Sequence, residues 1–176
     1  GPTHAPFINP TQLVAYAKAN PGKVSFGSSG TGSAAHLTSE LMKALTQTYM
    51  LHIPYRGAAP ALTDLLGGQI QLFFDAPTGL IQSGKSGRVR LIGVSSDKRL
   101  PAVPDVPNAT EAGIPGVVFE EFFPMVAPKG TPPEVLAALG AAFRQAIQQS
   151  APRLNEMTGV APRAGFETSA QGMALV

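Results

Sequence analysis

In the first half of the chain, short continuous apolar runs alternate with segments in which apolar residues repeat at helical spacing. Four short apolar runs, at residues 24–26, 49–53, 69–74 and 89–94, have the length of buried strands. Between the second and third runs, apolar residues repeat with the i, i+3, i+4 spacing of a helix: Ala58, Ala61, Leu62, Leu65 and Leu66. Strands that alternate with helices at these lengths predict an α/β fold with a parallel sheet and right-handed crossovers.

Turn and capping residues mark the ends of the predicted helices. Asn9-Pro10 begins a helix with an N-cap and a proline in its first turn, and this helix ends before Pro21-Gly22. A second helix is expected over about 33–47, and Gly67-Gly68 ends the third. A short helix or turn is expected over 77–82.

The pattern changes after residue 95. Residues 97–116 are rich in proline and predict a connection across the surface, followed by an extended apolar segment over 117–127. Thr131-Pro132-Pro133-Glu134 begins a long helix, whose apolar residues form one stripe: Val135, Leu136, Leu139, Phe143, Ala146 and Ile147. The expected organisation is a leading helix and linker (1–23), an α/β ligand-binding lobe (24–96), the crossover (97–116) and a final extended segment with its helix (117–176).

Composition narrows the function classes. Hydrophobic residues make up 44% of the 176 residues, but no apolar run approaches the ~20 residues of a membrane helix. A net charge of +2 with 14% charged residues argues against a nucleic-acid partner. The absence of cysteine excludes disulfides and thiolate metal sites. Since no carboxylate pair, metal cluster or catalytic triad can be assembled, we expect no enzyme activity, no metal and no cofactor.

A glycine-rich turn carries the clearest chemical signal. The segment Gly27-Ser28-Ser29-Gly30-Thr31-Gly32-Ser33 follows the first predicted strand and opens into the second helix. The first turn of a helix presents unpaired backbone N–H groups and the positive end of the helix dipole. Glycine allows a ligand to approach the backbone closely, and the hydroxyls add further donors. Such a turn is suited to a carboxylate or a phosphate.

Three more specific sequence motifs are alternatives to an anion-binding turn. A fourth alternative is purely structural: a turn between strand and helix that needs glycine only for tight packing. P-loop spacing is present, but Ser33 and Ala34 replace the required Lys and Ser/Thr. For a nucleophile elbow at Ser29, Thr31 occupies the position of the last glycine, which argues against this motif. The permissive dinucleotide fingerprint is met by Gly30-x-Gly32-x-x-Ala35. The alternative function is therefore a nucleotide-binding domain of an oxidoreductase, with Arg56 facing a 2′-phosphate.

Three loops are expected to meet where the parallel strands end, because ligands of such sheets bind beyond the carboxyl ends of the strands. These are the glycine-rich loop (28–33), the Tyr55 loop (54–58) and the Asp75 loop (75–79). His52 alternates with apolar neighbours on a strand and is interpreted as structural. The candidate ligand-binding residues are Ser28, Ser29, Gly30, Thr31, Gly32, Ser33, His36, Tyr55, Arg56, Asp75 and Ala76.

Several motifs in order resemble the substrate-binding proteins of tripartite tricarboxylate transporters, the Bug-type extracytoplasmic solute receptors. The resemblance runs from about Asn9 to the end of the chain. It is carried by Ala17-Lys18-Ala19-Asn20-Pro21-Gly22-Lys23, by the glycine-rich turn with His36-Leu37, by Pro54-Tyr55-Arg56-Gly57, by Phe74-Asp75, by Glu111-Ala112-Gly113-Ile114-Pro115-Gly116 and by Ala127-Pro128-x-Gly130-Thr131-Pro132. Ala76 departs from the Asn or Ser that usually follows Phe-Asp in the family.

The resemblance implies a type II periplasmic-binding-protein fold that captures a small carboxylate and presents it to a membrane permease. Within it, this sequence corresponds to lobe two with remnants of lobe one. Ser29, Thr31, Gly32 and Ser33 are expected to bind one carboxylate, with His36 in contact or bracing the loop. Tyr55 and Arg56 are expected to close over the far end, unless Arg56 is solvated or pairs with Asp64. Asp75 is expected to cap the following helix, or to bind the ammonium group of an amine-bearing ligand.

The resemblance also yields expectations about location and assembly. The implied location is the bacterial periplasm, and because Gly1-Pro2 resembles the remnant of a cleaved tag, any signal peptide is expected to lie outside this sequence. The upstream half of lobe one is expected to be missing. The apolar stripe of the last long helix would then lack its usual cover, which predicts a homodimer that exchanges this segment.

Overall fold

The computed structural model describes residues 1–119 and 125–158. The chain divides into two compact units, Gly1–Glu121 and Phe122–Val176. The first unit contains the sheet and all three candidate loops. The described residues of the second form one long helix and the segment that precedes it.

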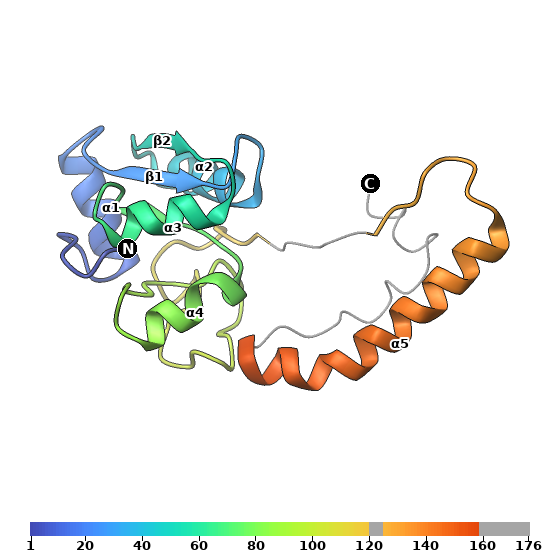
Figure 1. Cartoon of the computed structure of the whole chain (residues 1–176). Coiled ribbons are helices and arrows are strands. Elements are labelled where there is room, and N and C mark those ends of the chain that lie inside the picture. Colours follow the sequence, from blue (N-terminus) through green and yellow to red (C-terminus); the bar gives the residue numbers. More distant parts are fainter. Residues whose placement is uncertain (120–124, 159–176) are drawn as a thin grey trace. The chain divides into compact units, whose positions relative to one another are not determined.

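The first unit contains a three-stranded parallel sheet, and Figure 1 labels two of its strands. The strands are β1 (Ser25–Ser28), β2 (Leu51–Pro54) and β3 (Leu72–Phe73), and their order is β2-β1-β3. Both neighbours of β1 run parallel to it, as the alternation of strands and helices predicted. The expected α/β fold class is thereby confirmed, although β2 and β3 are shorter than their apolar runs.

The expected fourth strand at 89–94 was wrong. In the part of the chain that the structure describes, this segment makes only isolated bridges, from Val89 to Pro2 and from Val94 to Asn108. Its backbone groups are engaged elsewhere: the Arg90 amide donates to the Gly1 carbonyl at 2.8 Å, and the Gly1 amino group donates to the Arg90 carbonyl at 2.8 Å. Because the N-terminal residues satisfy these groups, the segment does not extend the sheet.

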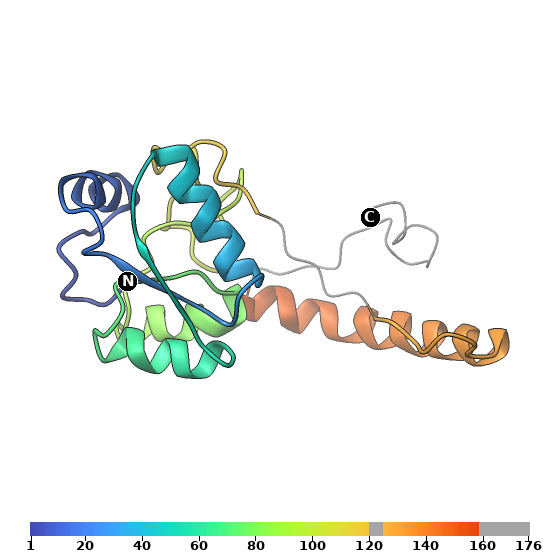
Figure 2. The ribbon, with the colours of Figure 1, turned by 90° about the horizontal axis from the view of Figure 1, so that it is seen from above.

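Helices cover both faces of the sheet. They are α1 (Pro10–Ala19), α2 (Ala34–Thr46), α3 (Ala58–Leu66) and α4 (Pro77–Lys85). Figure 2 shows α2 on one side of the strands and α3 on the other. The predicted start of α1 is confirmed, since the side chain of Asn9 accepts an N–H from the first turn at 2.8 Å.

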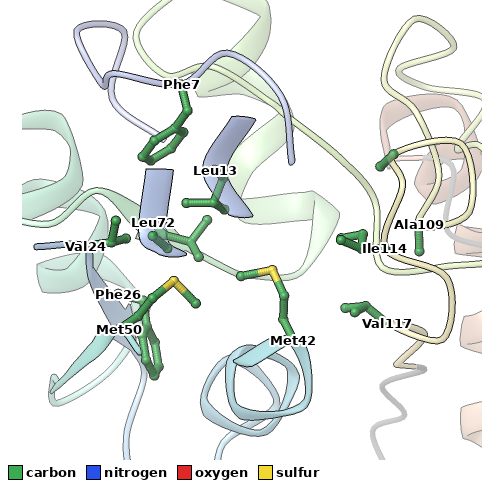
Figure 3. Packing of buried hydrophobic residues seen from close by; sticks show 12 residues of the cluster. Phe7, Leu13, Val24, Phe26, Met42, Met50, Leu72, Ala109, Ile114 and Val117 are labelled. Carbon is green, nitrogen blue, oxygen red and sulfur yellow. The ribbon is translucent and has the colours of Figure 1, made fainter. Parts of the chain in front are cut away.

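Two clusters of buried side chains form the core of the first unit. The larger joins α1, β1 and α2 to the proline-rich region (Figure 3), and its buried members are Phe7, Leu13, Ala17, Val24, Phe26, Met42, Met50, Leu72, Ala109, Ala112, Ile114 and Val117. The smaller packs α3 against the sheet through Ala61, Leu65, Ile70 and Phe73. Residues from the expected leading helix, lobe and crossover thus share one core, and Val117 is fully buried in it.

The second unit contains α5 (Pro133–Thr158), which includes Pro152. The predicted apolar stripe is present, but its large side chains are 42–46% exposed: Val135, Leu136, Leu139, Phe143 and Ile147. The expected extended segment over 117–127 includes 120–124, which lie outside the described residues. None of the described helices combines the length and the apolar character that crossing a membrane requires.

Candidate functional site

The strand register brings the three candidate loops to one edge of the sheet. Ser28 is paired with Pro54 and Gly27 with Phe73, so all three strands end at nearly the same level. Backbone bonds then join the first two loops: the Tyr55 amide donates to the Ser28 carbonyl at 3.0 Å, and the Gly57 amide donates to the Ser29 carbonyl at 3.2 Å. The Asp75 loop begins two residues beyond β3, on the other side of β1.

Local hydrogen bonds hold the glycine-rich loop open above the first turn of α2. Ser33 is the N-cap, and its Oγ accepts the His36 amide at 3.3 Å. Gly30 and Gly32 have φ values of +145° and +83°, which side-chain-bearing residues rarely adopt. The buried Ser28 hydroxyl contacts Gly30 on both sides, accepting its N–H at 3.3 Å and donating to its carbonyl at 3.1 Å.

Several donors of this loop remain available. Thr31 and Gly32 are exposed, and a Cβ added to Gly32 would meet no atom within 4 Å. Within the part of the chain that the structure describes, the Thr31 and Ala34 amides have no hydrogen-bond acceptor. Open space, unpaired N–H groups and the positive end of the α2 dipole therefore coincide, which is the arrangement that binds an anion.

The Tyr55 loop gives its two candidate residues different environments. The Tyr55 hydroxyl donates to Asp64 Oδ2 at 2.7 Å, and its ring packs with the smaller core cluster. Burial, together with this hydrogen bond and the negative charge of Asp64, raises the pKa of Tyr55 to about 12. Tyr55 thus ties β2 to α3. Arg56 is exposed, and the ion pairs of the described residues do not include it, so the considered pairing with Asp64 is not formed.

Asp75 lies half-buried at the end of β3. Burial raises its pKa, and a hydrogen bond from the Ala76 backbone N–H partly opposes this effect. A Cβ added to Gly79 would collide with Asp75 Oδ2, so glycine in the first turn of α4 makes room for the carboxyl group. The expected cap is not formed, because α4 has Ala76 at its N-cap position and no side-chain capping bond. No described residue forms an ion pair with Asp75.

Two histidines support the glycine-rich loop from behind. His36 Nδ1 accepts the Gly32 amide at 3.1 Å, and its ring stacks on His52 with centroids 4.1 Å apart. His52 Nε2 lies 2.7 Å from Ser28 Oγ, and its ring also stacks on Phe26. Sequence reasoning gave His52 no place at the site. Its register opposite Phe26 on the neighbouring strand places it beside the loop, and this register is known only once the strands are paired.

Comparison with known proteins identifies the family. Residues 1–173 match the family described as "Tripartite tricarboxylate transporter family receptor". The chain belongs to this receptor family. Among curated relatives, a protein of Pseudomonas sp. strain P51, described as the UPF0065 protein in the tcbD-tcbE intergenic region, is 42% identical over 147 residues, covering 83% of this chain and 44% of the relative. The chain thus spans less than half the length of this relative.

Solved structures of similar proteins agree with this assignment. "R. palustris Rpa4515 with adipate" is 30% identical with a TM-score of 0.90, and the match covers 99% of this chain and 58% of that one. MatC (Rpa3494) from Rhodopseudomonas palustris with bound malate is 27% identical with a TM-score of 0.83, covering 97% and 58%. The chain therefore has the expected α/β fold of periplasmic binding proteins. No finding favours the nucleotide-binding alternative.

Proposed function

We propose that this chain is the ligand-binding part of a periplasmic receptor that captures a small carboxylate and delivers it to a membrane permease. The observation that carries the proposal is the glycine-rich loop, which presents exposed N–H groups at the start of α2 in a chain of the receptor family. Adipate and malate in two structural neighbours support a carboxylate ligand. The role is binding rather than catalysis.

The three loops have separate roles in this proposal. Ser29, Thr31, Gly32 and Ser33 bind one carboxylate through backbone and hydroxyl donors, at about 1.5–3 kcal/mol for each charge-assisted bond. Arg56, exposed beside this loop, contacts the far end of the ligand, while Tyr55 holds the loop in place through Asp64. Asp75 and Ala76 line the third side and determine which acid is accepted.

Binding by this chain alone is expected to be weak. Pockets of receptors usually bury most of the ligand surface. The chain covers only 58% of the neighbouring adipate and malate structures, so a ligand on its loops keeps one side in water. We expect a Kd of about 1 mM instead of about 1 μM, a difference of about 4 kcal/mol.

Titration by NMR tests this function directly, because amide shifts report millimolar binding residue by residue. Adipate and malate should shift the amide signals of the glycine-rich loop, and a nicotinamide dinucleotide should not. Gly32→Val should weaken carboxylate binding about tenfold or more, because the side chain blocks the approach to the backbone. Binding as tight as that of the parent would place the site elsewhere.

Gly87→Val is the matched control for this substitution. Gly87 has φ +70°, and its added Cβ also meets nothing within 4 Å, so valine causes the same kind of backbone strain outside the loops. Both variants should lose about 1–3 kcal/mol of stability from that strain. Only Gly32→Val should also lose binding. Equal loss of binding in both would mean that the effect is one of folding.

We also propose that the 176-residue chain forms a homodimer through α5. The support is the apolar stripe of α5, from Val135 to Ile147, whose large side chains are more than 40% exposed. Contiguous apolar surface of this kind marks association sites. A second copy of the chain carries the same stripe. If the two copies exchange their α5 segments, as in domain swapping, both stripes become buried.

A further inference from the structure

One donor of the glycine-rich loop is already occupied by a side chain that can titrate. The Gly32 amide donates to His36 Nδ1 at 3.1 Å. Accepting this bond requires that Nδ1 carry no proton, so His36 is neutral with its proton on Nε2. Nε2 lies 4.0 Å from Glu40 Oε1 on the next turn of α2. The neutral ring thus occupies the Gly32 N–H, which would otherwise be available to an incoming anion.

The surroundings of His36 allow it to take up a proton. Its side chain is 19% exposed, so water reaches it. The titratable groups that face it are His52 on β2 and, on its own helix, Glu40, which also pairs with Lys43 at 2.7 Å. Burial lowers the pKa of His52, and a charge on His36 lowers it further. A positive charge on His36 therefore disfavours a second positive charge on the stacked His52 ring.

Protonation would reverse the polarity of the contact with Gly32. A proton on Nδ1 turns the acceptor into a donor, and the Gly32 N–H and the His36 N–H then point at the same space. A carboxylate oxygen placed there accepts from both groups. Both bonds are charge-assisted, and the bond from the imidazolium also joins opposite charges. The bound anion in turn favours the charged imidazolium.

We propose that His36 couples carboxylate binding at the glycine-rich loop to the uptake of one proton. Neutral His36 occupies the Gly32 N–H, and protonated His36 releases it and donates its own Nδ1–H to the ligand. This inference rests on the proposed function, since it concerns the same loop and the same class of ligand. The proton comes from solvent, is held at Nδ1 while the ligand is bound, and returns to solvent on release.

The test compares the affinity for malate at about pH 8 and about pH 6, because histidine ordinarily titrates near pH 6.5 while malate remains largely ionised over this range. The parent chain should bind malate about tenfold more tightly at the lower pH, the effect of about 1.4 kcal/mol of added interaction. Titration by NMR measures both affinities. In the ligand-free protein, the Gly32 amide proton signal should move with pH in a single step as its acceptor is lost.

Two variants isolate the histidine responsible. His36→Asn supplies an amide oxygen that can accept the Gly32 N–H but cannot titrate, so its affinity should be the same at both pH values and its Gly32 signal should show no step. His52→Gln removes the other imidazole while leaving a polar partner for Ser28. This variant should keep the pH dependence of the parent.

The outcomes separate this inference from the proposed function. Malate binding of equal strength at both pH values in the parent overturns the inference alone. A pH dependence that persists in His36→Asn, or disappears in His52→Gln, also overturns it. Failure of both malate and adipate to bind at either pH overturns the proposed function together with the inference. If a variant does not fold, the Gly32 titration of the ligand-free parent still decides whether the amide responds to a proton.

Discussion

Helices α3 and α5 carry the same type of apolar stripe but bury it very differently. In α3, Ala61 and Leu65 are at most 1% exposed, because they pack against the sheet beside Ile70 and Phe73. In α5, Leu139 and Phe143 are 45% and 46% exposed. The i, i+3, i+4 period predicts a helix and its apolar face. Whether that face is covered depends on which partner the rest of the chain brings to it.

A matched pair of leucine truncations measures this difference. Leu65→Ala should cost about 2–5 kcal/mol of unfolding free energy, because it removes fully buried methyl groups and leaves a cavity. Leu139→Ala should cost about 0.5 kcal/mol or less, as is usual at surface positions. Urea unfolding at low protein concentration measures both values. Equal costs would mean that the α5 stripe is packed against something in solution.

The proposed homodimer would cover the α5 stripe and so remove its difference in burial from α3. Disrupting the dimer therefore tests this difference directly. Phe143→Glu should weaken self-association about tenfold to a hundredfold, because it removes about 1.5–3 kcal/mol of apolar burial. Light scattering should show the parent as a dimer and the variant as a monomer at the same concentration. Ser150→Glu is a control that adds the same charge to the same helix. A parent chain that stays monomeric at every concentration contradicts the proposal.

The smallest expected effect lies in the first unit, at Asp75. Burial raises the pKa of this carboxyl, so the folded state holds its proton more strongly than the unfolded state does. Stability therefore decreases as the pH rises from the ordinary carboxyl value through the raised one. Asp75→Asn removes the charge but keeps an oxygen for the Ala76 N–H. The variant should melt slightly higher than the parent at neutral pH, and the difference should vanish in acid.

Thermal melting in a series of buffers checks this prediction. A variant that is less stable than the parent at neutral pH would show that the Asp75 carboxylate has a favourable partner. The α5 segment provides a reference, since Glu134→Gln in its exposed first turn should not reproduce this dependence.

The candidate site was predictable to the extent that it depends on local backbone chemistry. The glycine-rich turn and the approximate start of α2 were predicted, since each depends on neighbours a few residues away. The hydrogen-bond partner of Tyr55 was not predicted, because Asp64 lies nine residues further along the chain, in α3. His52 was missed for the same reason, since its contact with Ser28 exists only once β1 and β2 are paired.

The sequence by itself determined the helices, the parallel α/β order and the chemistry of the turn after β1. These follow from residue spacing, capping residues and backbone conformational preferences, which act within a few residues. Only the tertiary structure decided that Val89 pairs with Pro2 and Val94 with Asn108 instead of extending the sheet, and that the histidine pair lies behind the loop. Such outcomes depend on contacts between segments that lie far apart in the sequence. A local residue pattern does not show which of several possible partners a segment will contact.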